Sequence, residues 1–372
     1  MSFYDIDGIL LEDTDENPVI SRNKNMDEYL YAATNNGNRF TMLLVADPHG
    51  DDNNMNAAVS YLNEHSDVIN IGACLGDMAA GGYTSAYDWY INAVSQAVNP
   101  WLTVAGNHES GSNSRSIDRC GSAQQVYEKY MSPVYQYAGV TSDKNYYYKD
   151  FASQKIRIIV LWSTDVPDTL EDASTYVVDH LIVDCYSQAQ IDWLITTLNS
   201  TPSDYQVVIL THATPAWIAR NYNIPFTSDS DSAAGTGSTA KCHYPIIPDI
   251  VKAWIEGTTL TGSYEGVVSG APTLSVSADF TARGTGVFIG YFVGHVHVDI
   301  VNKVATYNQN VAAFACCPKN RGNGLVYKPG TKQADCITIV SIDTSTKKIY
   351  LLRIGQQLTP KLNVIKAAEI DY

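Results

Sequence analysis

Basic residues are scarce in this chain of 372 residues, which has 24 Lys and Arg against 39 Asp and Glu and a formal net charge of -15. An excess of negative charge repels polyanions at long range. We therefore do not expect the chain to wrap nucleic acid or to dock on an anionic membrane. Charged residues of both signs make up only 17% of the chain, which is below the usual quarter.

Cysteines are few and irregularly placed. Their number, seven, is odd, and they lack the short regular spacings of a disulfide scaffold or a zinc ribbon. Cys74 and Cys185 stand among apolar neighbours, so we expect them to be small buried hydrophobic residues.

Long apolar runs are absent as well. No stretch approaches the ~18 apolar residues that a membrane-spanning helix needs. The first residues carry neither a basic region nor an apolar core, so we expect no signal peptide. These absences predict a cytoplasmic or virion-associated protein without a transmembrane segment.

Several catalytic signatures are also missing. The chain has no Gly-x-Ser-x-Gly elbow, no Walker loop and no Gly-x-Gly-x-x-Gly after a strand. These absences argue against a serine hydrolase, a P-loop NTPase and a dinucleotide-binding enzyme.

What the chain does have is a regular alternation of apolar strands and amphipathic helices after a polar leader. We divide it into a leader at 1–38, one domain at 39–355 and a tail at 356–372. Strands are expected at 40–46, 68–75 and 101–105, with helices at 51–65 and 85–97 between them. Strand-helix units in succession predict an α/β domain with parallel strands.

The second half continues the alternation. We expect a hairpin at 146–151 and 155–161, a helix at 187–198 with Ser187 as its N-cap, and strands at 207–211 and 287–293. A C-terminal hairpin is expected at 336–342 and 348–353. The segment 218–240 is rich in Ser, Thr, Gly and Asp and is predicted to be a long surface loop.

Short polar clusters follow the ends of these strands. In chain order they are Asp47-Pro48-His49, Gly76-Asp77, Gly106-Asn107-His108-Glu109, His212 and Gly294-His295-Val296-His297. Ligands gather at the carboxyl ends of parallel strands. The clusters supply two carboxylates, one amide oxygen and four imidazoles, with a fifth imidazole to spare. Such a donor set suits two divalent transition metal ions held close together.

The order of these clusters resembles that of the calcineurin-like metallophosphoesterases, over about residues 41–355. The resemblance implies a four-layer α/β/β/α sandwich with two mixed β-sheets and a dinuclear metal site at the carboxyl-terminal edge of the strands. It implies that one metal ion is bound by Asp47, His49 and His297. It implies that the other is bound by Asn107, His212 and His295, while Asp77 bridges both. The ions would be Mn, Fe or Zn, and ligand type does not separate these.

The resemblance makes His108 the catalytic residue, which contacts the phosphate and protonates the leaving group. Glu109 has two open interpretations: a group that fixes its neighbours by hydrogen bonds, or a solvated or capping carboxylate. His65, His180 and His243 belong to no motif, and we expect surface or packing residues there.

The implied activity is hydrolysis of a phosphate mono- or diester by in-line attack of a metal-bridging hydroxide. Met78-Ala-Ala-Gly81 replaces the Val-Asp-Arg-Gly stretch of protein Ser/Thr phosphatases, which favours the bacterial and phage branch instead. The expected substrate is a small phosphate ester or a cell-surface phosphoester. The alternatives are a non-catalytic structural or binding protein, such as a phage tail component, and a nuclease, against which the net charge argues.

Overall fold

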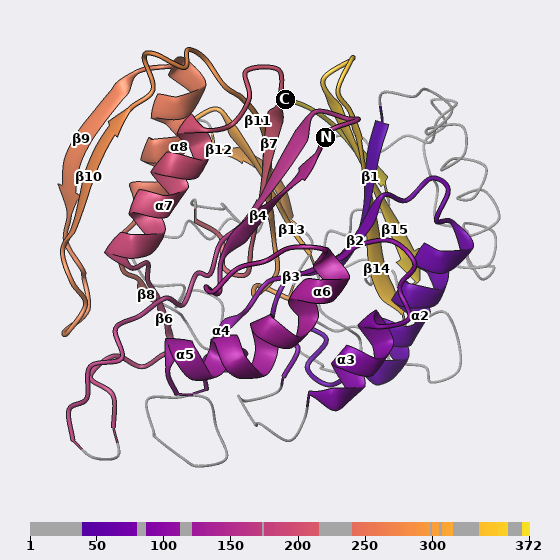
Figure 1. Ribbon diagram of the computed structural model, residues 1–372, viewed down its shortest axis with the longest axis horizontal. Helices are drawn as coiled ribbons and strands as arrows, with labels where there is room; N and C mark the ends of the chain where they lie inside the picture. The colour runs from indigo at the N-terminus through magenta and orange to yellow at the C-terminus, as the bar shows by residue number, and fades with distance from the viewer. Residues whose placement is uncertain are drawn as a thin grey trace.

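Two six-stranded β-sheets pack face to face, and helices cover the outer face of each (Figure 1). This computed structural model describes residues 39–79, 87–111, 121–172, 175–215, 240–297, 300–304, 307–314, 335–355 and 367–372. The architecture is the mixed α/β sandwich predicted from the sequence, with two mixed sheets in the middle.

The first sheet joins the start of the described chain to its end. Its strands lie in the order β16 (Ala367–Asp371), β15 (Lys348–Gly355), β14 (Cys336–Asp343), β1 (Arg39–Val45), β2 (Ile71–Cys74) and β3 (Trp101–Thr103). β1, β2 and β3 are parallel, whereas β14, β15 and β16 form antiparallel pairs. Helices α2 (Asp52–Glu64) and α3 (Asp88–Val94) pack against each other, and α2 lies on β1, β2 and β14.

The second sheet is built from the middle of the chain. Its order is β12 (Ile300–Val304), β13 (Gln309–Ala313), β11 (Val287–Val293), β7 (Gln206–Thr211), β5 (Ile156–Val160) and β4 (Tyr147–Phe151). The four inner strands are parallel, and the two edge strands are antiparallel to their neighbours. Helices α7 (Gln188–Asn199) and α8 (Ile246–Glu256) pack side by side on its outer face (Figure 1).

Smaller elements surround these layers. Two strand pairs, β9 (Thr259–Tyr264) with β10 (Leu274–Asp279) and β6 (Val183–Asp184) with β8 (Ala240–Lys241), lie outside the main sheets. Short helical turns follow β3, at α4 (Asn107–Ser110), α5 (Ala123–Val126), η1 (Tyr127–Met131), η2 (Ser132–Val134) and α6 (Tyr135–Ala138).

The alternation of side chains along β7 explains how one strand serves two cores. Val208 and Leu210 lie in the core between the sheets. Val207 and Ile209 point the other way and pack with residues of α7 and α8. Successive side chains of a strand face opposite sides of its sheet, so a strand covered on both faces is a continuous apolar run.

Most elements lie where the sequence predicts them. The hairpin of β4 and β5, the C-terminal hairpin of β14 and β15, and helix α7 are confirmed. The Ser187 hydroxyl accepts a hydrogen bond from the backbone N–H of Gln190, as expected of an N-cap. The loop expected at 218–240 lies outside the described residues, apart from its last position.

One difference concerns the C-terminal segment. Within the stretch predicted to be a tail, Ala367–Asp371 forms β16 and pairs with β15 as the edge strand of the first sheet. The alternation of Ala and Ile with acidic residues there is too short to distinguish from coil by sequence. The other domain limits stay predictions. Among the described residues, no helix is long and apolar enough to cross a membrane.

Candidate metal centre

The polar clusters meet at one edge of the sandwich because they follow parallel strands of the two facing sheets. From the first sheet, Asp47 and His49 follow β1, Asp77 follows β2, and Asn107 begins α4 after β3. From the second, His212 follows β7, while His295 and His297 follow β11. Hydrogen bonds between backbone groups join neighbouring turns, since Asp47 N–H donates to Gly76 O and Gly294 N–H donates to His212 O.

The backbone at these turns adopts a conformation that residues other than glycine rarely adopt. Positive φ angles occur at five predicted ligands: Asp47 (48°), His49 (43°), Asp77 (55°), His295 (65°) and His297 (55°). Each such residue raises the free energy of the folded state by about 1–3 kcal/mol, and residues of this kind cluster at functional sites. The strain therefore marks this edge as a site and not only as a set of turns.

Close approach explains the glycines between the turns. A Cβ atom at Gly106 would lie 2.3 Å from Asp77 Oδ1, and one at Gly294 would lie 2.8 Å from Asp47 Oδ2. Any side chain at these positions would displace a carboxylate of the centre. Glycine therefore occupies the positions at which a carboxylate of the centre approaches the backbone too closely for a Cβ atom.

The first group of ligand atoms belongs to Asp47, His49, Asp77 and His297, all within 4.8 Å of one another. His49 Nε2 lies 3.3 Å from His297 Nε2 and 3.7 Å from Asp77 Oδ2. His297 Nε2 lies 3.3 Å from Asp47 Oδ1. These four side chains come from three strands and converge on one point.

The second group comprises Asp77, His212 and His295, again within 4.8 Å. His212 Nε2 lies 3.2 Å from Asp77 Oδ2 and 3.2 Å from His295 Nδ1. Asn107 Oδ1 lies 3.0 Å from the same His212 nitrogen. Asp77 is thus common to both groups, which is the position that the family resemblance implies for a bridging carboxylate.

Outer hydrogen bonds fix which atoms face the centre. His212 Nδ1 lies 2.7 Å from Leu75 O, and His49 Nδ1 lies 3.3 Å from Ala79 O. A carbonyl oxygen only accepts, so each ring donates through Nδ1–H and turns Nε2 inward. Asn107 Nδ2 donates to Leu181 O at 2.7 Å, which turns Oδ1 inward as well. Histidines that bind metals are held in this way by backbone carbonyls.

The inward-facing atoms are therefore electron-pair donors that face one another, an arrangement that a cation stabilises. Burial raises the pKa of Asp77, but His212 and His108 outweigh burial and hold that pKa well below its usual value. Burial lowers the pKa of His212, and Asp77 and Asp47 outweigh it, which raises this pKa to about 10. The buried carboxylates thus stabilise positive charge in the centre. That charge is a proton on an imidazole or a metal ion that displaces the proton. The donor set fits two divalent ions.

His108 lies at the rim of this centre. Its backbone N–H donates to Asp77 Oδ1 at 2.9 Å, and its Nε2 lies 3.9 Å from Asp77 Oδ2. Its ring packs edge-on against His49, with the ring centroids 4.7 Å apart. With its side chain 31% exposed, His108 is more open to solvent than His49 (8%) and His212 (0%).

Glu109 is fully buried, and its hydrogen bonds both fix its neighbours and cap a helix, so of the interpretations only a solvated carboxylate is excluded. Its carboxylate accepts hydrogen bonds from the backbone N–H groups of Asp77 (2.9 Å), Ala79 (2.8 Å) and Gly106 (2.7 Å). The bond from Gly106 caps α4, and the other two fix the turn that carries Asp77. Burial is the main cause that raises the pKa of Glu109 to about 7. The side chain holds two turns of the site together and is not solvated.

Sequence reasoning missed the backbone carbonyls of Leu75, Ala79 and Leu181. Their contribution depends only on where the chain passes, so residue type carries no signal for it.

Comparison with known proteins identifies one family. The family model described as calcineurin-like phosphoesterase matches residues 40–299. No curated protein sequence matches the chain. Among solved structures, a purple acid phosphatase from yellow lupin is similar, with 13% identity and a TM-score of 0.47 over 90% of this chain. The chain spans only 54% of the lupin protein's length.

Two other solved structures are similar over most of their own length. One is GAP50, described as the anchor in the inner membrane complex of Plasmodium, which is 8% identical to this chain with a TM-score of 0.43. The match covers 90% of this chain and 89% of GAP50. The other is an archaeal phosphodiesterase, which is 9% identical to this chain with a TM-score of 0.33. The match covers 84% of this chain and 99% of the phosphodiesterase.

Proposed function

The chain belongs to the calcineurin-like phosphoesterase family, and from that premise we propose that it hydrolyses a phosphate monoester or diester at a centre of two divalent metal ions. The observation that carries the proposal is the place of Asp77, which is shared by two groups of inward-facing donors. Asp77 Oδ2 is the atom that faces both His49 and His212, and a carboxylate oxygen shared by two ions fits a metal pair about 3.5–4 Å apart, the spacing of two-metal phosphatases.

In this proposal Asp47, His49 and His297 hold one ion. Asn107, His212 and His295 hold the other, and Asp77 bridges them. When bound, the ions supply Lewis acidity, which polarises the phosphoryl group and makes water a stronger nucleophile. The mixed nitrogen and oxygen donors suit manganese, iron and zinc alike.

The protein's own groups position the reaction. Asp77 and Asp47 supply the negative charge that retains the ions, while Leu75, Ala79 and Leu181 keep the donors aimed inward. His108 is the proton donor: its exposed ring lies beside Asp77, within reach of a leaving oxygen at the rim. Protonation of the departing alkoxide by a positioned imidazole accelerates such reactions by about 100–10,000-fold.

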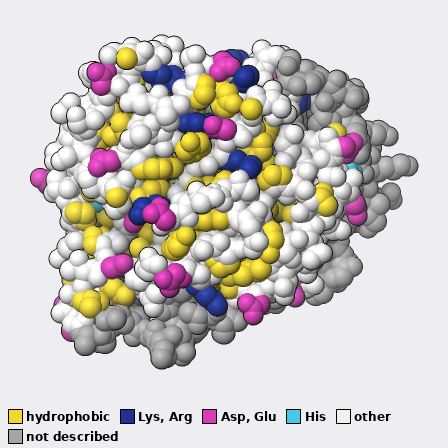
Figure 2. Space-filling view, viewed as in Figure 1, with side chains coloured by type: hydrophobic (Ala, Val, Ile, Leu, Met, Phe, Trp, Pro, Cys, Tyr) yellow, Lys and Arg dark blue, Asp and Glu magenta, His cyan; other side chains and the backbone are white. Residues whose placement is uncertain are grey.

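Charge favours a small substrate over a polynucleotide. The net charge of -15 opposes long-range attraction of a polyanion. On the face shown in Figure 2, Lys and Arg side chains lie singly among acidic and neutral ones and form no continuous basic patch among the described residues. We propose a small phosphate ester or a cell-surface phosphoester as substrate, and not DNA. The bacterial and phage branch and the cytoplasmic or virion-associated location stay predictions.

The test compares the wild-type protein with His108→Asn on a panel of chromogenic monoesters and diesters with added manganese. We expect turnover by the wild type, lost in the variant, and a preference that distinguishes monoesters from diesters. Absence of turnover on every substrate, despite two bound ions per chain, would favour the alternative of a structural or binding protein that keeps the fold.

A further inference from the structure

A second group of metal-binding side chains lies apart from the dinuclear centre. Cys185 follows β6 and Cys242 follows β8, and these strands pair in parallel with Val183 opposite Ala240. Cys242 N–H donates to Asp184 O at 2.8 Å, which continues the pairing by one residue. The ligand atoms of Cys185, Cys242 and the adjacent His243 all lie within 4.8 Å of one another, and all three residues are buried.

The imidazole of His243 is aimed at the thiols. Its Nε2 lies 2.7 Å from Pro272 O, and because a carbonyl only accepts, the ring proton is on Nε2. Burial lowers the pKa of His243, so the ring is neutral. Its Nδ1 lone pair faces Cys185 Sγ. An imidazole that donates one N–H to a backbone carbonyl and presents the other nitrogen inward is arranged as a metal ligand.

The separation of the atoms fits a tetrahedral ion. Zinc binds thiolate at about 2.3 Å and imidazole at about 2.0–2.1 Å, so sulfur and nitrogen on one tetrahedral ion lie about 3.6 Å apart. Cys185 Sγ lies 3.6 Å from His243 Nδ1. These two atoms therefore already have the separation that the ion requires.

We propose that Cys185, Cys242 and His243 bind one zinc ion, separate in place and in ligand chemistry from the dinuclear centre. Two thiolates and one imidazole are softer donors than the carboxylates, amide and imidazoles of that centre, and they select zinc over magnesium or manganese. Metal binding requires both thiols to lose their protons, and their contact lowers the pKa of Cys242 while it raises that of Cys185.

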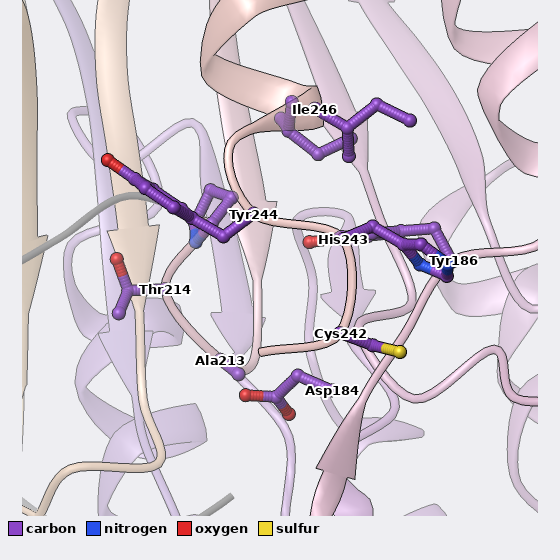
Figure 3. A pocket seen from close by; sticks show the side chains of 10 residues that line it. Asp184, Tyr186, Ala213, Thr214, Cys242, His243, Tyr244 and Ile246 are labelled. Carbon is purple, nitrogen blue, oxygen red and sulfur yellow. The ribbon is translucent and has the colours of Figure 1, made fainter. Parts of the chain in front are cut away.

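A pocket supplies the remaining position. Cys242 and His243 lie in the wall of a small pocket that opens to solvent, beside Asp184 and Tyr186 (Figure 3). Three protein ligands leave a tetrahedral zinc ion one position for an exchangeable donor, which a water molecule from this pocket would fill. Ala213 and Thr214, which directly follow His212, lie in the wall of the same pocket.

Cobalt distinguishes the two kinds of site, because only thiolate ligands give a sulfur-to-cobalt charge-transfer absorption. Reduced full-length protein is titrated with Co²⁺ alone. We expect one equivalent to produce this absorption in the wild type and in Cys336→Ser, which removes a buried cysteine elsewhere. Cys185→Ser and Cys242→Ser should abolish it. Asp77→Ala should keep it while losing the other two ions, so failure of the dinuclear centre does not affect this readout.

Three results would overturn the proposal. One is a reduced wild-type protein without the charge-transfer absorption, and another is an absorption that survives in Cys242→Ser. The third is a Cys185–Cys242 disulfide, found by peptide mapping, in protein that binds no thiolate-ligated metal once reduced. If the serine variants do not fold, zinc-edge X-ray absorption of the wild type decides: sulfur neighbours at about 2.3 Å support the site, and a shell of nitrogen and oxygen alone contradicts it.

Discussion

Replacement of Glu109 tests how far the metal centre depends on one buried carboxylate outside the proposed ligands. Its Oε2 accepts from Asp77 and Gly106 N–H, and its Oε1 accepts from Ala79 N–H. Glu109→Ala removes all three acceptors and leaves three buried N–H groups without partners. Glu109→Gln keeps one oxygen, which can serve the two N–H groups on the Oε2 side, and turns an NH₂ group toward Ala79.

The magnitudes follow from the number of donors left unpaired. A buried donor without a partner costs about 1–3 kcal/mol, so Glu109→Ala should lower the free energy of unfolding by about 3–9 kcal/mol. Glu109→Gln should lower it by about a third of that, since one donor loses its acceptor. Because the Asp77 turn loosens in both variants, metal affinity should fall by about 10–100-fold in Glu109→Gln, as is typical when an outer partner of a metal site is removed.

Chemical denaturation and metal titration measure the two effects. Glu64→Gln is the matched control, since Glu64 is an exposed carboxylate near the end of α2 and should change neither quantity. Equal stability and equal metal affinity of Glu109→Gln and the wild type would show that the carboxylate does not hold the two turns, and the reasoning would be refuted.

Other predictions concern the centre and its surroundings. Asp77→Ala should lose both ions of the dinuclear centre by elemental analysis, and retention of both would remove Asp77 from the bridging role. His108→Asn should keep both ions but lose about 100–10,000-fold in turnover, which an unchanged rate on a poor leaving group would contradict. Gly106→Ala should lose metal and activity because its methyl group would lie 2.3 Å from Asp77 Oδ1, whereas Gly262→Ala, whose Cβ meets nothing nearer than 3.4 Å, should lose neither. Burial raises the pKa of Asp165 from 3.8 to about 6. Between these two pH values the folded protein holds a proton that the unfolded chain has released. The free energy of unfolding should therefore fall by about 3 kcal/mol as the pH rises through this window. Asp165→Asn should remove that part of the pH dependence in denaturation curves, and an unaltered slope would count against it.

The sequence predicts the strands and the turns that follow them because both depend on local patterns. The apolar run before Asp47 must be buried on both faces, and that requirement places it inside a sheet that is covered on both sides. Glycines beside the carboxylates mark close approach, and the structure shows contacts that a Cβ atom would prevent. The role of Glu109 was left open at the sequence level because its three partners are backbone groups, which residue type does not reveal.

Other features depend on contacts between distant segments. Cys185 and His243 belong to no common motif, and only the pairing of β6 with β8 brings them together. From sequence alone we interpreted Cys185 as a small buried hydrophobic residue and His243 as a surface or packing residue. Both are buried, as packing residues would be, but burial alone does not account for the aim of the imidazole. The pairing of β16 with β15 was missed for the same reason, because a short edge strand forms only where a neighbouring strand is available for pairing.

The most direct test of the account is an anomalous-scattering measurement on crystals grown with manganese. We expect two peaks about 3.5–4 Å apart, with an oxygen of Asp77 close to each. A single peak, or two peaks that do not share Asp77, would contradict the proposal that this carboxylate bridges a metal pair.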